Sequence, residues 1–458
     1  MENTRHTSSF RDPSGFVFTE DNLLKRIIFP IYFKQYNALN DSGFFNKLFH
    51  NQLLVPHQEL KKSATEIHIQ PEQIPFISYP YEWSFNQYKE AALLTLKIQK
   101  YSLEHGFSLK DASAFNVTFH NGQALFIDTL SFDFYNENEP WRAYKQFITH
   151  FLAPLLLAHY HGAQSLKMMA NFIDGIPMNM LTSMLPFKTK LNPFLYSNIH
   201  LLAKFEDKHN EDYEGTANPK KLSKKAQLNI ITSLYDYIKK LNLKEYSEWG
   251  NYYDKTNYAQ DAFNYKADLI NSWVHKLNPK TLIDVGGNDG TFVRRITHKL
   301  DTAIVCDIDN NAVDFNYTTL KINKEKHIIP LVLDVLNPSA GLGFNNTERD
   351  SFLNRIQQFS PDVTLALALI HHITLSGNVT FNMSANFFAS FSKHLIIEFP
   401  NREDSWVQRL LNTKGEFKAH FDFYSEENFE EAYSKIFTIV EKVSIPNAKR
   451  TMYFLKLK

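Results

Sequence analysis

The C-terminal part of the chain alternates short apolar runs with segments whose apolar residues recur at helical spacing. The runs predict strands and the segments predict helices, so a regular βα alternation is expected from about Ala262 onwards. The predicted helices are Ala262–Lys276, Phe292–Lys299, one from Asn311, and Asn382–Phe391, and the predicted strands are Thr281–Val285, Ala303–Asp307, Ile328–Asp334, Val363–Leu369 and Leu395–Glu398. Apolar strands separated by helices indicate a parallel sheet covered on both faces.

Two further strands end the chain without a helix between them. The runs Phe437–Val443 and Arg450–Leu455 are joined only by Ser444–Lys449. A parallel crossover needs a dozen or more residues, so these two strands should pair antiparallel. The predicted fold is therefore α/β, with a seven-stranded, Rossmann-like sheet that ends in an antiparallel hairpin. This arrangement is typical of class I methyltransferases.

The N-terminal part mixes helical and strand patterns. Glu90–Lys100 has its apolar residues on one helical stripe, within a longer helix expected over Gln87–His105. Asn116–Phe119 and Ala124–Ile127 then flank Asn121-Gly122, which predicts a β-hairpin. An α+β domain is expected over residues 1–190, a mainly helical linker over 191–262, and the domain with the seven-stranded sheet over 263–458.

Composition limits the classes of function. Lys plus Arg and Asp plus Glu both number 49, which gives no support for a nucleic-acid partner. Cys306 is the single cysteine, so an internal disulfide and a multi-cysteine zinc site are excluded, and no metal site is expected. The polar N-terminus and the lack of a long apolar run predict a cytoplasmic protein without a membrane span. The oligomeric state stays open.

A glycine-rich turn follows the first predicted strand of the C-terminal domain. Asp284-Val285-Gly286-Gly287-Asn288-Asp289-Gly290 lacks the Lys-Ser/Thr pair of a P-loop and the dinucleotide fingerprint G-x-G-x-x-G. It resembles the acid-x-G-x-G-x-G pattern of methyltransferases that use S-adenosylmethionine (SAM), with Asn288 at the middle glycine. Asn tolerates positive φ, so this difference is physically mild.

Acidic residues follow the next two predicted strands. Asp307 lies 23 residues after Asp284, where a carboxylate can accept hydrogen bonds from both ribose hydroxyls. Asp334 falls where the methyltransferase family has its adenine-contacting residue. A single acid at such a place is a common helix cap or loop residue, but three acids and a glycine loop at successive strand ends favour SAM binding. The expected cofactor-binding residues are Asp284, Gly286, Gly287, Asn288, Gly290, Asp307 and Asp334.

Candidate catalytic groups follow the fourth and fifth strands. His371 and His372 are the preferred bases because the fourth strand ends beside the same crevice and histidine titrates near neutrality. At least one of the pair is expected to be structural, and the sequence does not say which. Glu398 is a second candidate for binding a substrate amine or hydroxyl, with a cap or ion-pair role equally open. The aromatic residues Trp249, Tyr252, Tyr253 and Tyr258 are a candidate lid or interdomain core.

A kinase-like pattern occurs in the N-terminal domain. The spacing of Asp111 and Asn116 matches the catalytic loop H-R-D-x-x-x-x-N, and Asp128 falls where kinases place a metal-binding aspartate. No clear strand lysine precedes them, and Lys25 is an unconvincing substitute. The alternative is that Asp111 and Asn116 order a β-hairpin by local hydrogen bonds. The region is interpreted as a kinase-related fold for binding or scaffolding, with ATP and Mg²⁺ as possible ligands.

The whole chain resembles the bacterial NoeA-like, nodulation-related methyltransferases. The resemblance rests on Ser78–Phe85, Leu109–Phe115, Phe126–Phe132, Asn337-Pro338-Ser339, Glu348-Arg349 and Leu367–Ile373. It implies methyl transfer to a small-molecule acceptor or to a glycan or lipid precursor. Two alternatives stay open: a bifunctional protein whose N-terminal domain uses ATP, and a non-catalytic scaffold that binds SAM.

Overall fold

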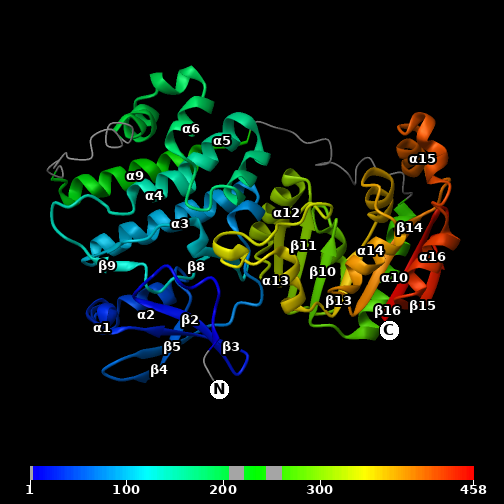
Figure 1. The fold of residues 1–458 in the computed structure, drawn as a ribbon, viewed down its shortest axis with the longest axis horizontal. Coiled ribbons are helices and arrows are strands. Elements are labelled where there is room, and N and C mark those ends of the chain that lie inside the picture. Colours follow the sequence, from blue (N-terminus) through cyan, green and yellow to red (C-terminus); the bar gives the residue numbers. More distant parts are fainter. Residues whose placement is uncertain (1–3, 206–220, 244–259) are drawn as a thin grey trace. The chain divides into compact units, whose positions relative to one another are not determined.

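The computed structural model describes residues 4–205, 221–243 and 260–458 and divides into two compact units (Figure 1). The N-terminal unit comprises Met1–Glu245 with Gly341–Arg349, and the C-terminal unit comprises Tyr246–Ala340 with Asp350–Lys458. The domain limits expected at residues 190 and 262 stay predictions. The aromatic residues Trp249, Tyr252, Tyr253 and Tyr258 lie outside the described residues. Within those residues, no helix has the length and apolar character to cross a bilayer.

The N-terminal unit begins with a five-stranded sheet in the order β1-β2-β3-β5-β4. All neighbouring strands in it pair antiparallel. The strands are β1 Thr4–Arg5, β2 Gly15–Glu20, β3 Leu23–Ile28, β4 His57–Lys62 and β5 Ile67–Pro71. Helices α1 (Phe33–Asp41) and α2 (Phe44–His50) lie between β3 and β4 in the chain.

The long helix α3 (Phe85–Glu104) is the central helix of this unit. Ser84 caps it by accepting from the backbone N–H of Gln87, whose own side chain reaches back, so the capping box defines where the helix begins. The hairpin of β7 (Val117–His120) and β8 (Gln123–Phe126) follows. Asn121 and Gly122 both have positive φ, as the predicted two-residue turn requires.

The rest of the N-terminal unit is mainly helical. Strands β6 and β9 pair on either side of the hairpin in the chain, and α9 packs against α3. These elements are β6 Phe107–Leu109, β9 Phe132–Phe134, α4 Tyr144–Phe147, η4 Ile148–Leu152, α5 Ala153–His161, η5 Ala163–Ala170, α6 Met178–Met184, η6 Phe187–Leu191, α7 Pro193–Leu195, η7 Tyr196–His200 and α9 Lys224–Lys240.

A short segment from the second half of the sequence packs in the N-terminal unit. Gly341–Arg349 belongs to that unit, and its Glu348 side chain is buried. Glu348 accepts from the Arg11 guanidinium at 2.7 Å, and the Arg349 guanidinium lies 4.6 Å from the centre of the Phe115 ring. The two units are therefore not contiguous in sequence, which the apolar pattern did not indicate.

The C-terminal unit contains a seven-stranded sheet in the order β12-β11-β10-β13-β14-β16-β15. The first five strands in that order are parallel, whereas β16 is antiparallel to both β14 and β15. This confirms the predicted mixed sheet and its antiparallel terminal hairpin. The strands are β10 Thr281–Val285, β11 Thr302–Asp307, β12 Ile328–Val332, β13 Val363–Ala366, β14 His394–Pro400, β15 Phe437–Ser444 and β16 Arg450–Leu457.

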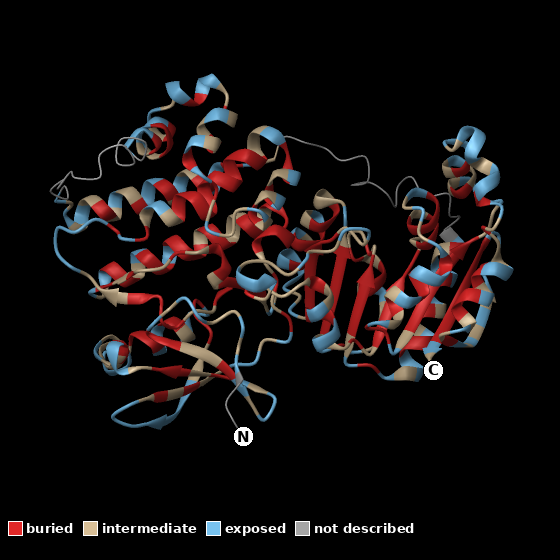
Figure 2. Cartoon of the chain, viewed as in Figure 1, coloured by how far each residue is buried: buried red, intermediate tan, exposed pale blue. Residues whose placement is uncertain are grey.

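Burial along the strands shows where the core lies. The five parallel strands are buried along nearly their whole length, because helices cover both faces (Figure 2). In the edge strand β15 only Phe437 is buried, and the residues after it alternate between exposed and half-buried. The helices are α10 Gln260–Leu277, α11 Thr291–Arg295, α12 Asn310–Asn323, α13 Phe352–Phe359, α14 Phe381–Ala389, α15 Ser405–Asn412 and α16 Glu426–Ser434.

The strand order reverses between β10 and β13. From β10 the chain proceeds outward through β11 and β12, and it then returns to place β13 on the other side of β10. Open α/β sheets bind ligands at the carboxyl ends of the strands beside such a switch point. The glycine loop follows β10 and His371-His372 follows β13, so the topology brings both motifs to this edge.

Candidate functional site

A cavity of about 310 Å³ lies at the switch point of the C-terminal sheet. Its wall is mostly apolar and includes all seven expected cofactor-binding residues except Gly290. The cavity-lining residues are Phe263, Lys266, Asp284, Val285, Gly286, Gly287, Asn288, Phe292, Cys306, Asp307, Ile308, Asp309, Leu333, Asp334, Val335, Leu336, Leu367, Ala368, Leu369, His372, Ile373 and Ser376.

Backbone conformation and lack of space explain the residue types in the glycine loop. Gly286 and Gly290 have φ of 76° and 77°, and Asn288 has φ of 49°, as its tolerance for positive φ predicted. A Cβ at Gly287 would lie 2.7 Å from the Asp284 carboxyl carbon. Ala368, which also lines the cavity, has a positive φ of 49° as well. Backbone strain of this kind is common at ligand sites, and an alanine in a sequence does not indicate it.

Asp307 is held in place by the backbone around it. Its Oδ2 accepts the N–H of Asn288 at 2.9 Å, and its Oδ1 accepts the N–H of Asp309 at 2.9 Å. The loop after β10 therefore orients the carboxylate that ends β11, and each oxygen keeps a lone pair for another donor. Asp334 also lines the cavity, and its Oδ1 accepts the N–H of Leu336 at 3.0 Å.

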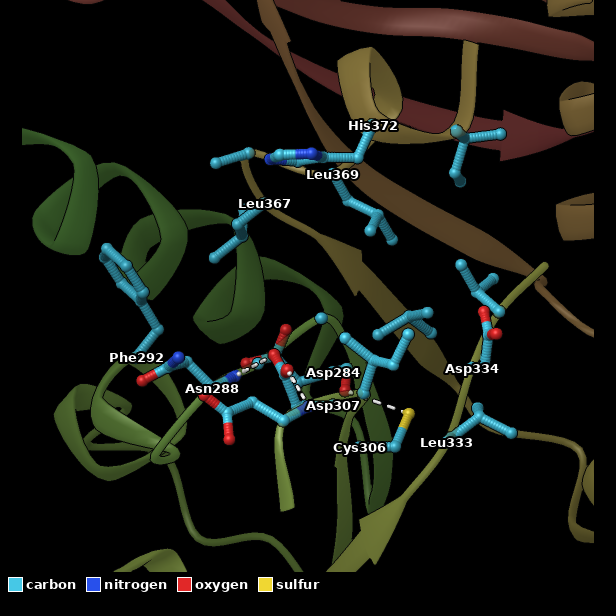
Figure 3. A pocket seen from close by; sticks show the side chains of 18 of the residues that line it. Asp284, Asn288, Phe292, Cys306, Asp307, Leu333, Asp334, Leu367, Leu369 and His372 are labelled. Carbon is cyan, nitrogen blue, oxygen red and sulfur yellow. Dashed lines mark hydrogen bonds between the residues drawn. The ribbon is translucent and has the colours of Figure 1, made fainter. Parts of the chain in front are cut away.

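Asp284 is fully buried in the cavity wall, and neither of its carboxyl oxygens has a hydrogen-bond partner among the described residues. Figure 3 shows it grouped with Asn288 and Asp307. Burial raises the pKa of this carboxyl to about 7, although the charge of Lys266 acts in the opposite direction. A buried acceptor without a donor is costly, so a bound group that carried a donor or a positive charge would stabilise the ionised carboxylate.

Because burying the ionised Asp284 carboxylate is unfavourable, the stability of the protein should depend on pH. The folded state keeps the Asp284 proton up to about pH 7, whereas the ordinary pKa is 3.8, so stability is lost as the pH rises between these values. We expect Asp284→Asn to raise the free energy of unfolding of the ligand-free protein at pH 8, by on the order of 2 to 4 kcal/mol. The gain should shrink towards pH 4. Thermal unfolding of both proteins across this range tests it, and a gain independent of pH would contradict it.

The structure separates the two candidate histidines. His372 is in the cavity wall, whereas His371 is almost fully buried and is not among the cavity-lining residues. Figure 3 shows the His372 side chain on a different side of the cavity from Asp284 and Asp307. Burial and the charge of Arg450 both lower the pKa of His372. A lowered pKa keeps the ring neutral at pH 7, which is the form that can accept a proton.

Glu398 lies outside the cavity wall, in a buried ion-pair network. Its Oε2 accepts from Lys266 Nζ at 2.5 Å, and its Oε1 lies 3.2 Å from Arg450 Nη1. Arg450 in turn donates from Nε to Asp404 at 2.8 Å. The network joins α10, β14 and β16, and it brings Lys266 into the cavity wall. Lys266 was not identified from the sequence, because only its place on a helix face was visible there.

A second cluster forms in the N-terminal unit from the kinase-like motif residues. Ser131 Oγ donates to Asp128 Oδ2 at 2.5 Å and accepts from the Asn116 amide at 3.2 Å. Asp111 accepts from the Gln146 amide at 2.8 Å. Burial raises the pKa of Asp111, and the charge of Asp128 raises it further. The residues of the kinase-like motif, Asp111, Asn116 and Asp128, therefore lie close together in the folded chain.

The cation of this cluster is Arg26. Successive residues of a strand point to opposite faces, so Lys25 and Arg26 on β3 face different surroundings. Lys25 pairs with Glu20 at 2.6 Å, whereas the Arg26 guanidinium forms an ion pair with Asp128. Lys25 is therefore not the ion-pair partner of Asp128. The sequence alone could not show which of the adjacent residues Lys25 and Arg26 faces this aspartate.

Comparison with known proteins gives one close relative and several distant structures. No protein-family model matches the chain. The chain is 32% identical to the nodulation protein NoeA of Rhizobium meliloti (strain 1021) over 462 residues, which cover 98% of this chain and 95% of that protein.

Among solved structures, similarity extends to the bifunctional kinase-methyltransferase WbdD, with 14% identity and a TM-score of 0.32 over 47% of this chain and 43% of that chain. The N-methyltransferase NodS from Bradyrhizobium japonicum WM9, in complex with S-adenosyl-L-homocysteine, is 12% identical with a TM-score of 0.29, over 42% of this chain and 86% of that chain. The chain spans less than half the length of WbdD.

Proposed function

The chain belongs to the family of the nodulation protein NoeA, and from this premise we propose that its C-terminal unit is a SAM-dependent methyltransferase. The acceptor is a small molecule or a glycan or lipid precursor. The residues that hold SAM are the glycine loop from Asp284 to Gly290, together with Asp307 and Asp334. The observation that carries the proposal is the carboxylate of Asp284, which has no hydrogen-bond partner among the described residues, beside a second carboxylate, Asp307, that is suited to a ribose.

The Asp307 side of the cavity suits a nucleoside. A carboxylate oriented by two backbone N–H groups can accept from both hydroxyls of a ribose. Ile308 and Leu336, which line the cavity next to Asp307 and Asp334, are 59% and 46% exposed. Large apolar side chains left this open in a cavity are typical of a site for a flat apolar ring such as adenine.

Asp284 distinguishes SAM from a dinucleotide. A pyrophosphate at the glycine loop would place two negative charges near a buried carboxylate, which is strongly unfavourable. The sulfonium and ammonium groups of SAM are positive, and each favours the ionised form of Asp284. A cationic ligand should therefore lower the pKa of about 7 that burial imposes on this carboxyl.

When bound, SAM supplies an electrophilic methyl group to an acceptor atom aligned with it. The chain has to position that acceptor, exclude water and remove a proton where the acceptor carries one. His372 is the residue of the wall that serves as base, because it is neutral at pH 7 and lines the cavity. The apolar wall formed by residues such as Phe292, Leu367 and Leu369 excludes water.

Calorimetric titration tests the proposal directly. We expect SAM and S-adenosylhomocysteine to bind with micromolar dissociation constants, and NADH not to bind. A methyl-transfer screen with methyl-labelled SAM then separates an enzyme from a scaffold that only binds SAM. Tight binding of NADH, or no binding of either SAM ligand by the folded protein, would refute the proposal.

An ATP-dependent activity of the N-terminal unit is the second candidate, and the gathering of Asp111, Asn116 and Asp128 favours it. The ion pair of Arg26 with Asp128 opposes it, because a divalent ion on Asp128 would have to displace a guanidinium. For the wild-type protein we expect a dissociation constant for Mg-ATP above about 1 mM, a binding free energy weaker than about −4 kcal/mol.

The direction in which an Arg26 substitution changes the affinity for Mg-ATP distinguishes two possible roles of the guanidinium. If the guanidinium blocks the metal position, Arg26→Ala strengthens the binding of Mg-ATP; if it binds phosphate, the same change weakens it. We expect strengthening, measured by calorimetry with Mg-ATP. Lys25→Ala, on the other face of β3, is the matched control and should have no effect.

A further inference from the structure

Large apolar side chains are exposed on the helical turns that follow α6 in the N-terminal unit. In η6 only Thr189 is buried, and its hydroxyl lies 2.9 Å from Nε2 of His200 on η7. Phe187 and Leu191, at the two ends of η6, are 71% and 72% exposed. Three more large apolar side chains are exposed on η7 and the helical residues after it: Tyr196, Leu201 and Phe205. These five side chains and the lysines among them, Lys188, Lys190 and Lys204, form what we call the η6–η7 surface.

The region around this surface carries a local excess of positive charge. Residues 160–205 contain four lysines, no arginine and one acid, Asp174, which forms an ion pair with Arg11 at 2.9 Å. Stacking of Phe194 on Tyr237, with ring centres 4.1 Å apart, brings α9 against the same region. Helix α9 adds four lysines and one acid. Because the whole chain has no net charge, the excess belongs to this part of the molecule.

The lysines of the η6–η7 surface are free to meet an external anion. Lys188, Lys190 and Lys204 are exposed and lie over aromatic rings, 5.3 to 5.7 Å from the ring centres. Among the described residues, no carboxylate forms an ion pair with any of the three. An anionic partner would therefore gain their charge without having to displace a described acid.

The combination of exposed apolar side chains with lysine favours one kind of partner. Protein–protein interfaces are depleted in lysine. Nucleic-acid sites use arginine as well as lysine on phosphates and aromatic rings on bases, whereas residues 160–205 lack arginine and expose Leu191 and Leu201. A membrane with anionic lipids offers both a negative surface for lysine and an apolar layer beneath it.

We propose that the η6–η7 surface binds a membrane that contains anionic lipids. Phe187 and Leu191 enter the boundary between the headgroups and the acyl chains, and Lys188 and Lys190 stay at the level of the lipid phosphates. Lysine suits this position because its methylene groups contact apolar surface while its ammonium group stays in water. The inference does not depend on methyl transfer, because these residues belong to the N-terminal unit.

Sedimentation of the full chain with vesicles tests the proposal. We expect binding to vesicles of phosphatidylglycerol and phosphatidylcholine in equal amounts, and binding at least about tenfold weaker to phosphatidylcholine alone. The double variant Phe187→Ala/Leu191→Ala should weaken binding to the mixed vesicles by about 10- to 100-fold, because two large apolar side chains no longer enter the lipid. Lys188→Gln/Lys190→Gln should weaken it by about 10- to 30-fold and leave binding to phosphatidylcholine unchanged.

Matched controls come from exposed residues elsewhere in the same unit. Ile31 is 69% exposed on η1 (Pro30–Tyr32), so Ile31→Ala removes a similar apolar side chain from another place. Lys61→Gln/Lys62→Gln removes two neighbouring exposed lysines from β4. Both controls should bind the mixed vesicles like the wild type. Because the substituted side chains are exposed, every variant should keep its unfolding temperature within about 2 °C.

Several results would overturn the proposal. These are no binding of the wild type to either kind of vesicle, equal binding to both, or unchanged binding by Phe187→Ala/Leu191→Ala. A wild-type dimer that this variant converts to a monomer in size-exclusion chromatography would assign the surface to a second copy of the chain.

The sequence of residues 206–220 contains five acids and two lysines and is a competing occupant. If it covers the surface, the wild type does not bind the mixed vesicles, and binding appears only when these five acids are replaced by amides. That result, too, would overturn the proposal. Binding by the wild type, with the same affinity after the five replacements or a higher one, supports it.

Discussion

Replacing Asp307 with alanine is expected to weaken the binding of S-adenosylhomocysteine by at least 100-fold. The carboxylate ends β11 in the cavity wall, and backbone N–H groups hold both of its oxygens. Hydrogen bonds to a charged acceptor contribute about 1.5 to 3 kcal/mol each, and a ribose offers two hydroxyls. Two lost bonds therefore correspond to about 3 kcal/mol or more, which is above 100-fold in the dissociation constant.

Calorimetry at pH 8 is the suitable measurement, because burial raises the pKa of Asp307 to about 6 and the carboxylate is then ionised. Asp301→Ala provides the control: this exposed residue directly precedes the other end of the same strand. Asp307→Asn should be intermediate, since an amide oxygen can still accept one hydrogen bond. If Asp307→Ala binds S-adenosylhomocysteine like the wild type, Asp307 does not contact the ribose.

Replacing His372 with alanine is expected to lower kcat for methyl transfer by about 10²- to 10⁴-fold, the usual contribution of a general base. The affinity for S-adenosylhomocysteine should change by less than about threefold, because binding rests on the glycine loop and on carboxylates from other strands. The measurement uses methyl-labelled SAM and the acceptor that a methyl-transfer screen identifies. A variant that keeps full turnover would remove His372 as the base.

The pH profile supplies a second criterion for His372. Its pKa is lowered from 6.5, so in the wild type kcat should be constant near pH 7 and fall only as the pH drops below 6.5. The fall occurs because protonation removes the acceptor lone pair of the ring. This acid limb should be absent from the residual activity of His372→Ala. His371→Ala is the comparison: a buried ring outside the cavity wall should affect stability more than the acid limb.

Much of the C-terminal unit could be predicted from local patterns. All seven predicted strands are present, and the NoeA-like resemblance is confirmed by the relative at 32% identity. The errors concern helices and ends. Helix α13 (Phe352–Phe359) was not predicted, and α11 ends at Arg295, four residues before the predicted end at Lys299. The residue at which a helix ends depends on its packing and its capping interactions. The spacing of apolar residues in the sequence does not report either of them.

The sequence by itself determined the features of the glycine loop and of the rest of the chain that depend on neighbouring residues. Backbone preferences explain the positive φ at Asn288 and the turn at Asn121-Gly122. The short connection between the last two strands explains why they pair antiparallel. The position of Asp307 at the end of a strand was likewise predictable from the local sequence pattern.

Only the tertiary structure decided which side chains meet. It placed His372 and not His371 in the cavity wall, paired Arg26 and not Lys25 with Asp128, and joined Lys266 to Glu398 across 132 residues of sequence. It also left the buried Asp284 carboxylate without a hydrogen-bond partner among the described residues. The physical reason is that burial and charge pairing depend on elements far apart in the chain, whereas a sequence pattern records only the faces of each element.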